Sequence, residues 1–93
     1  MEKWKGKIAV VTGASVGIGE AIVKDLSKQG ITVIGLARRP EKIEKYASKL
    51  SEGQIFARKC DVSDLESIKT AFQWIEEKFG VINILVNNAG IGA

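Results

Sequence analysis

Three glycines stand close together in the stretch VVTGASVGIGEAI, namely Gly13, Gly17 and Gly19. The short apolar run before them predicts a buried strand, and the residues after them have helical spacing. A strand-to-helix turn with so few side chains lets the backbone approach a phosphate closely, and a helix N-terminus attracts anions. The pattern therefore indicates a turn that binds the pyrophosphate of a dinucleotide, with a purely structural glycine turn as the alternative.

Two arginines follow the next apolar run, in the stretch GLARRPEK. An NAD-binding chain places an acid about twenty residues beyond the glycines, where it binds the ribose 2′-hydroxyl. Here Arg38 and Arg39 come first, and no acid occurs until Glu41. Because a guanidinium pairs well with a 2′-phosphate, the sequence favours NADP over NAD, with Glu44 as a minor partner that steadies an arginine. Alternatively, both arginines are solvent-exposed residues at a helix start, although cations are mildly unfavourable there.

The elements that must position these residues alternate between strands and helices. Apolar runs predict four strands: KIAVVTG, ITVIGLA, QIFARKC and INILVNNAG, the last of which runs into a turn. Apolar residues at helical spacing predict the inner faces of three helices: Ile18, Ala21, Ile22 and Leu26; Ile43, Ala47 and Leu50; Leu65, Ile68, Phe72, Ile75 and Phe79.

The ends of the predicted helices carry recognisable signals. The first helix is predicted from Ile18 to Gln29, and Pro40 suits the first position of the second. Ser63 and Glu66 have the spacing of a capping box at the start of the third. Glycines end all three helices: Gly30, Gly53 and Gly80.

The resulting order, β-α-β-α-β-α-β, predicts parallel strands joined by right-handed crossovers. We therefore expect an α/β protein with the first half of a Rossmann-type doubly wound parallel sheet, in strand order 3-2-1-4. Residues 1–93 are expected to form the N-terminal half of a single dinucleotide-binding domain.

Composition narrows the classes of function. The net charge is only +3, with lysines scattered over the predicted helices, so we expect no nucleic-acid partner. No apolar run approaches the ~18 residues of a membrane helix, and no secretory signal is visible. Cys60 is the single cysteine, which excludes an internal disulfide and predicts a reducing, cytoplasmic location. No metal site is predicted, because the chain has no histidine.

The glycine spacing T-G-x-x-x-G-x-G, from Thr12 to Gly19, resembles that of the short-chain dehydrogenase/reductase family. CDVSD after the third strand, NNAG after the fourth and the order of elements support this resemblance, which covers the whole chain. The opening MEKWKGKIAVVTGAS, together with GLAR, is further similar to the farnesol dehydrogenase-like subgroup of that family.

The resemblance implies cofactor contacts at the strand ends. The implied residues are Gly13, Ser15, Gly17, Ile18 and Gly19 at the pyrophosphate, Asp61 and Val62 at the adenine, and Asn88 with Gly90 in the NNAG segment at the adenosine ribose. Ser15 would bond a phosphate or ribose oxygen, Asp61 the adenine amino group, and Asn88 would also tie the fourth strand to the sheet. Alternatively, Asp61 is only a neighbour of a helix cap, and Asn87 and Asn88 form a plain turn.

In this family a hydride passes between nicotinamide C4 and an alcohol or carbonyl carbon, and a serine, a tyrosine and a lysine four residues further on assist the transfer. All of these lie beyond residue 93 in family order, so no catalytic residue is predicted here. Tyr46 and Lys49 look like the tyrosine–lysine pair, but they are three residues apart on the second helix, and we interpret both as ordinary helix residues.

The resemblance therefore implies the cofactor-binding part of an NADP-dependent oxidoreductase, which in its full length acts on a small alcohol or carbonyl substrate and forms a homo-oligomer. The 93 residues alone are predicted to be inactive. The alternative is a naturally short, non-catalytic module that binds a nucleotide or a partner protein. No membrane partner is expected.

Overall fold

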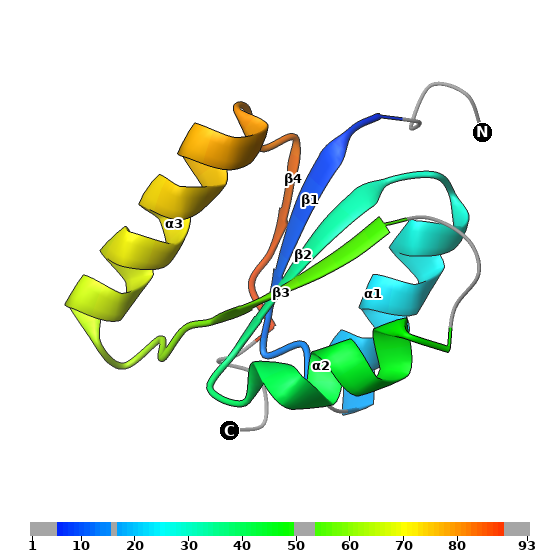
Figure 1. Cartoon of the computed structure of the whole chain (residues 1–93), viewed down its shortest axis with the longest axis horizontal. Helices are drawn as coiled ribbons and strands as arrows, with labels where there is room; N and C mark the ends of the chain where they lie inside the picture. The colour runs from blue at the N-terminus through cyan, green and yellow to red at the C-terminus, as the bar shows by residue number, and fades with distance from the viewer. Residues whose placement is uncertain (1–5, 16, 50–53, 89–93) are drawn as a thin grey trace.

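The computed structural model describes residues 6–15, 17–49 and 54–88. In chain order its elements are β1 (Ile8–Thr12), α1 (Gly17–Lys28), β2 (Thr32–Ala37), α2 (Pro40–Ala47), β3 (Gln54–Lys59), α3 (Leu65–Phe79) and β4 (Ile84–Val86). All strand pairs are parallel, and the sheet order is β3-β2-β1-β4. Helices α1 and α2 lie on one face of the sheet and α3 on the other (Figure 1). The predicted α/β class and strand order are confirmed.

Apart from Thr12 and Thr32, the central strands β1 and β2 are apolar, because helices cover both of their faces. Successive side chains of a strand point to opposite faces. Thus Val11 and Val33 belong to the core beneath α1 and α2, whereas Val10 and Ile34 belong to the core beneath α3. All four side chains are fully buried, so these two strands hold the two layers of the molecule together.

The buried face of α1 differs from the predicted one. Its innermost residues are Gly19, Val23 and Ser27, whereas Ile18 is 64% exposed and Ala21 is exposed as well. The other two predicted residues, Ile22 and Leu26, flank this line and are partly buried. The prediction was therefore wrong for Ile18 and Ala21, because apolar spacing marks only the broad side of a helix. At Gly19 the lack of a side chain lets the helix backbone come near Gly13, and this turns Gly19 inward.

The buried face of α2 includes Ile43, as predicted, together with Tyr46, while Ala47 is only partly buried. The predicted inner residue Leu50 and the predicted helix end Gly53 lie outside the described residues.

Helix α3 packs mainly through Ala71 and Ile75, with Phe72 and Phe79 partly buried beside them. The predicted inner residue Ile68 is also partly buried, but Leu65 is 63% exposed.

The predicted capping box of α3 is wrong. Asp64 is the N-cap, and its carboxylate accepts a hydrogen bond of 3.0 Å from the Glu66 backbone N–H. Ser63 instead donates its hydroxyl to Asp61 Oδ1 at 2.6 Å. The helix begins at Leu65, one residue later than the Ser63–Glu66 spacing requires, so Asp64 and not Ser63 is placed to accept from the free N–H groups of the first turn. Across the described residues, no helix is both long and apolar enough to cross a membrane.

The two edges of the sheet differ in charge. On one edge β3 carries Arg58 and Lys59, and charged residues hinder the pairing of an edge strand with another chain. On the other edge β4 has the sequence ILV without a charge, and Leu85 is 56% exposed. In the part of the chain that the structure describes, β4 pairs only with β1. Its outer edge is therefore the better template for association.

We expect the 93-residue chain to self-associate through β4. The substitution Leu85→Lys should shift the chain toward the monomer, because a charge on the edge strand opposes pairing. Leu65→Lys is the matched control, since Leu65 is similarly exposed but lies on α3. Sedimentation velocity over a range of concentrations measures the effect, and a wild-type chain that stays monomeric throughout contradicts the prediction.

Candidate functional site

A cleft of about 790 Å³ opens where β1, β2 and β3 end. Several of the predicted site residues line it: Gly13, Ser15, Arg38, Arg39, Asp61 and Val62. They come from three separate turns, which the parallel sheet brings together because its strands all end at the same edge. Ligands of open α/β sheets bind at this edge, and the volume lies within the usual range of roughly 300–1,000 Å³ for small-molecule pockets.

The turn after β1 depends on a close approach between Gly19 and Gly13. A Cβ atom at Gly19 would overlap the Gly13 carbonyl oxygen and lie 2.9 Å from the Gly13 carbonyl carbon. Gly13 and Gly17 both have φ of +62°, in the left-handed region that favours glycine. Each of the three glycines therefore has a backbone reason for its place. Gly17 begins α1, and Ile18 follows it with its side chain in solvent.

Asn88 joins the end of β4 to the same turn. Its side-chain Nδ2 donates to the Gly13 carbonyl oxygen at 3.1 Å, and its backbone N–H donates to Thr12 Oγ1 at 2.9 Å. The side chain is buried and is not part of the cleft wall. The structure therefore provides the predicted tie between the fourth strand and the sheet. Gly90, the remaining predicted residue of this segment, lies outside the described residues.

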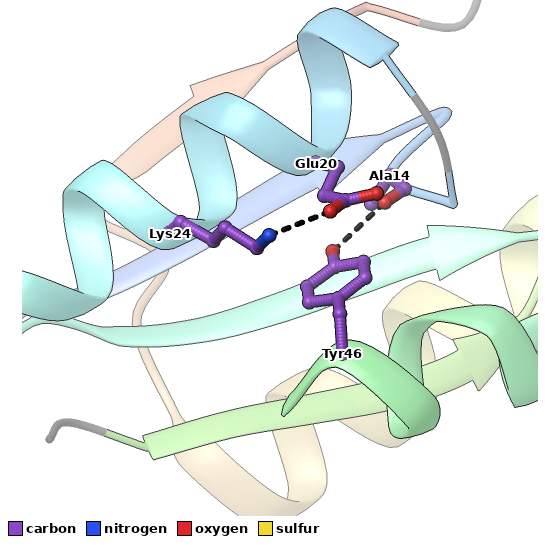
Figure 2. Close-up of polar contacts among 4 residues, drawn as sticks. All are labelled: Ala14, Glu20, Lys24 and Tyr46. Atoms are coloured by element: carbon purple, nitrogen blue, oxygen red, sulfur yellow. Dashed lines mark hydrogen bonds and ion pairs between the residues drawn. The ribbon is translucent and has the colours of Figure 1, made fainter. Parts of the chain in front are cut away.

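Tyr46 reaches the glycine turn from α2, a contact that the sequence analysis missed. Its hydroxyl donates to the Ala14 carbonyl oxygen at 2.8 Å, across 32 residues of sequence (Figure 2). Lys24 Nζ lies 5.4 Å from the centre of the Tyr46 ring and forms an ion pair of 2.7 Å with Glu20. Tyr46 thus lies on the second helix, as predicted, but its contact with the glycine turn was not predicted. Helical spacing shows which face a residue is on but not what its hydroxyl meets.

Burial raises the pKa of the Tyr46 phenol above its usual range, and the negative charge of Glu20 raises it further. The phenol is therefore neutral at physiological pH and remains a hydrogen-bond donor. Its low exposure of 8% fits this state, because a neutral donor with a partner is tolerated in a protein interior.

Asp61 is the acidic group of the cleft. Ser63 donates both its hydroxyl and its backbone N–H, at 2.6 Å and 3.0 Å, to Asp61 Oδ1. These bonds lower the pKa of Asp61, and the positive charges of Arg38 and Lys59 lower it further. The carboxylate is thus ionised at neutral pH and can accept a hydrogen bond from a ligand.

Lys59 is a cleft residue that the sequence analysis did not single out. It is exposed at the end of β3 and lines the cleft together with Arg38 and Arg39, so three cations line the cleft. Its position just before the CDVSD stretch, at the carboxyl end of a predicted strand, was the signal that could have identified it.

Glu44 is not part of the cleft wall. It lines a second groove of about 500 Å³, which shares Lys59 with the cleft and runs past β3 toward Glu66 on α3. Among the described residues it forms no ion pair with Arg38 or Arg39. The structure therefore does not bring Glu44 together with the other predicted site residues, because it lies one turn into α2, beyond the helix start that faces the cleft.

Comparison with known proteins agrees with this geometry. Residues 7–93 match the family model described as short chain dehydrogenase. The chain is 54% identical over 94 residues to a farnesol dehydrogenase of Aedes aegypti and 41% identical over 95 residues to dehydrogenase/reductase SDR family member 11 of Gallus gallus. Each alignment includes 98% of this chain but only 38% and 37% of the respective relative. The chain thus spans less than two fifths of their length.

Solved structures show the same arrangement of elements. A metagenomic short-chain oxidoreductase in complex with NADP superposes with a TM-score of 0.90 at 36% identity, over 96% of this chain and 41% of that chain. L-sorbose reductase from Gluconobacter frateurii, complexed with NADPH and L-sorbose, superposes with a TM-score of 0.85 at 35% identity, over 96% of this chain and 35% of that one.

We expect Gly19→Ala to destabilise the chain, against the usual preference of helices. Helix propensity alone favours alanine over glycine by about 1 kcal/mol. The overlap with the Gly13 carbonyl should reverse this sign and cost about 1–3 kcal/mol in the free energy of unfolding. The reverse exchange Ala21→Gly, at an exposed position of α1, calibrates the propensity effect. Urea denaturation measures both variants, and a Gly19→Ala variant that is more stable than wild type contradicts the close approach.

Alkaline pH should unfold the chain through Tyr46. The folded chain holds the phenol proton more tightly than the unfolded chain, whose phenol titrates near the ordinary pKa of about 10. The stabilisation is therefore complete below about pH 10 and is lost as the pH rises above that value. Tyr46 is the single tyrosine, so ultraviolet absorbance reports its ionisation alone. Tyrosinate should appear together with the loss of helical circular dichroism. Ionisation of Tyr46 near pH 10 while the chain stays folded would contradict this prediction.

Proposed function

This chain belongs to the short chain dehydrogenase family, and we propose that it forms the adenosine and pyrophosphate part of an NADP site. The whole protein would be an oxidoreductase that transfers hydride between nicotinamide and an alcohol or carbonyl substrate. The observation that carries the proposal is the cleft in which the glycine turn, Arg38, Arg39 and Asp61 meet at the carboxyl edge of the sheet.

The pyrophosphate is proposed to lie against the turn after β1. Helix α1 starts directly after this turn, and the partial positive charge of its N-terminus favours the phosphates. Apart from its chain neighbours and the backbone of its own helix, Gly17 has no atom within 4 Å of where its Cβ would lie, so a phosphate can approach the backbone. Ser15, in the cleft wall, adds a hydroxyl donor.

The adenosine end is proposed to lie between the turns after β2 and β3. Ser63 occupies Asp61 Oδ1, and the second carboxylate oxygen is the acceptor for the adenine amino group. The backbone of Val62, a half-exposed residue of the cleft wall, faces the adenine ring. Asn88 contributes beside the ribose through its hold on the turn.

The preference for NADP rests on positive charge. Arg38 and Arg39 are exposed at the cleft, and Lys59 stands on the same wall, so a 2′-phosphate would meet three cations. A guanidinium binds phosphate through two parallel charge-assisted hydrogen bonds, whereas NAD offers only a hydroxyl at this position. The metagenomic oxidoreductase and the sorbose reductase, which were solved with NADP and NADPH, support the proposal by analogy.

The chemical step itself is proposed to need residues beyond these 93. Tyr46 is the single tyrosine, and its hydroxyl donates to the Ala14 carbonyl oxygen. We therefore propose that this chain binds the cofactor but does not turn it over. A cytoplasmic, homo-oligomeric full-length protein remains a prediction from the sequence.

The substitution Arg38→Ala tests the assignment of the 2′-phosphate. It should weaken NADP binding by about 1.5–3 kcal/mol, the range for a hydrogen bond to a charged group, and leave NAD binding nearly unchanged. Lys45→Ala is the control, because Lys45 is an exposed cation of α2 outside the cleft wall. Calorimetric titration of the 93-residue chain with both cofactors measures the difference. Equal losses for NADP and NAD would contradict the assignment.

A further inference from the structure

None of the proposed cofactor contacts uses the hydroxyl group of Tyr46. The ring alone explains its burial, because phenylalanine would fill the same space between α2 and the sheet. The hydroxyl, however, is aimed at one acceptor, the Ala14 carbonyl oxygen at 2.8 Å (Figure 2). Ala14 stands between Gly13 and Ser15, both of which line the cofactor cleft. The hydroxyl therefore acts on the turn itself.

The planarity of the Ala14–Ser15 peptide links the Tyr46 hydrogen bond to the orientation of a backbone N–H at the cleft. The peptide unit between Ala14 and Ser15 is planar and trans, so its carbonyl and its N–H point in opposite directions. When Tyr46 holds the Ala14 carbonyl, the Ser15 N–H must point away from Tyr46. The preceding peptide is held as well, because the Ala14 N–H donates to the Leu36 carbonyl oxygen of β2 at 3.2 Å. Ala14 is thus fixed on both sides.

We propose that Tyr46 is a positioning residue for the pyrophosphate turn: its hydroxyl fixes the Ala14–Ser15 peptide so that the Ser15 N–H is directed to the cofactor's phosphates. This inference rests on the proposed function, since it assumes that the turn receives a pyrophosphate. Without the hydroxyl, this hold on the Ala14 carbonyl is lost, and part of the binding energy would be used to order the peptide.

The same helix connects the two ends of the cofactor site. Arg39 is the N-cap of α2, and Tyr46 lies in its last turn. Helix α2 is seated on β2 where Gly35 lacks a side chain, because a Cβ there would lie 3.1 Å from both Ala14 and Ile43. One short rigid element therefore bears on both the arginines and the pyrophosphate turn, and the hydroxyl of Tyr46 is its polar contact with that turn.

The variant Tyr46→Phe isolates the hydroxyl, because it keeps the ring in the core. Its affinity should be compared for NADP and for 2′-AMP, which carries adenine, ribose and the 2′-phosphate but no pyrophosphate. NADP affinity should fall by about three- to tenfold, the equivalent of one hydrogen bond, while 2′-AMP affinity stays within twofold of wild type, which is about the resolution of such titrations.

Ser48→Ala is the matched control. It also removes one hydroxyl bond of 2.8 Å to a carbonyl, that of Lys45, at the exposed end of the same helix. Any loss of thermal stability that comes from a weaker α2 should be the same in Ser48→Ala and in Tyr46→Phe. The affinities of Ser48→Ala for both ligands should be unchanged. Thermal melting of both variants verifies that they are folded at the temperature of titration.

A second measurement keeps the wild-type side chain nearly intact. Incorporation of 3-fluorotyrosine labels position 46 alone, because the chain has a single tyrosine. The fluorine resonance should shift when NADP binds and should stay in place with 2′-AMP. This experiment decides the matter if Tyr46→Phe does not fold.

The outcomes separate this inference from the proposed function. Three results overturn the role of Tyr46 and leave the proposed function standing. They are equal NADP affinity in wild type and Tyr46→Phe, an equal loss of affinity for NADP and 2′-AMP, or a fluorine resonance that does not shift when NADP binds. A folded wild-type chain that binds neither ligand overturns the proposed function, and with it this inference.

Discussion

The close approach of two backbone segments, at Gly13 and Gly19, is the constraint on which the rest of the structure depends. Helix α1 can start directly against the turn after β1 only because no side chain separates them. The Asn88 side chain bonds to the same carbonyl oxygen of Gly13, so β4 is also positioned by this contact. One crowded point therefore sets where the first helix begins and where the fourth strand ends, and Gly13 at this point also lines the cleft.

The cleft follows from the parallel sheet. Turns that are far apart in the sequence meet because every strand ends at the same edge, and this brings Arg38, Lys59 and Asp61 to one wall. The two cations help to keep the carboxylate ionised, together with the hydrogen bonds from Ser63. Local charge and fold are thus linked: the sheet brings the two cations near the acid, and they add to the larger effect of the Ser63 hydrogen bonds in lowering its pKa.

Local patterns predicted the wrong neighbour at the starts of two helices. Ser63 has the spacing of a capping residue, but α3 begins one residue later than this spacing requires, so Asp64 caps it and the Ser63 hydroxyl donates to Asp61. The broad apolar side of α1 includes Ile18, which in the structure is in solvent because Gly19 is turned to the sheet. In both cases the sequence contains the group, but only packing selects its neighbour.

The sequence by itself determined the order of elements, the parallel sheet with its strand order, the glycine turn, and the two arginines after the second strand. These features depend on periodicity and on short-range backbone geometry. Only the tertiary structure decided that Tyr46 bonds to Ala14, that Lys59 joins the cleft and that Glu44 faces another groove. These contacts join residues from different turns and helices. Their existence depends on the angle and depth at which each helix packs on the sheet, quantities that no local pattern encodes.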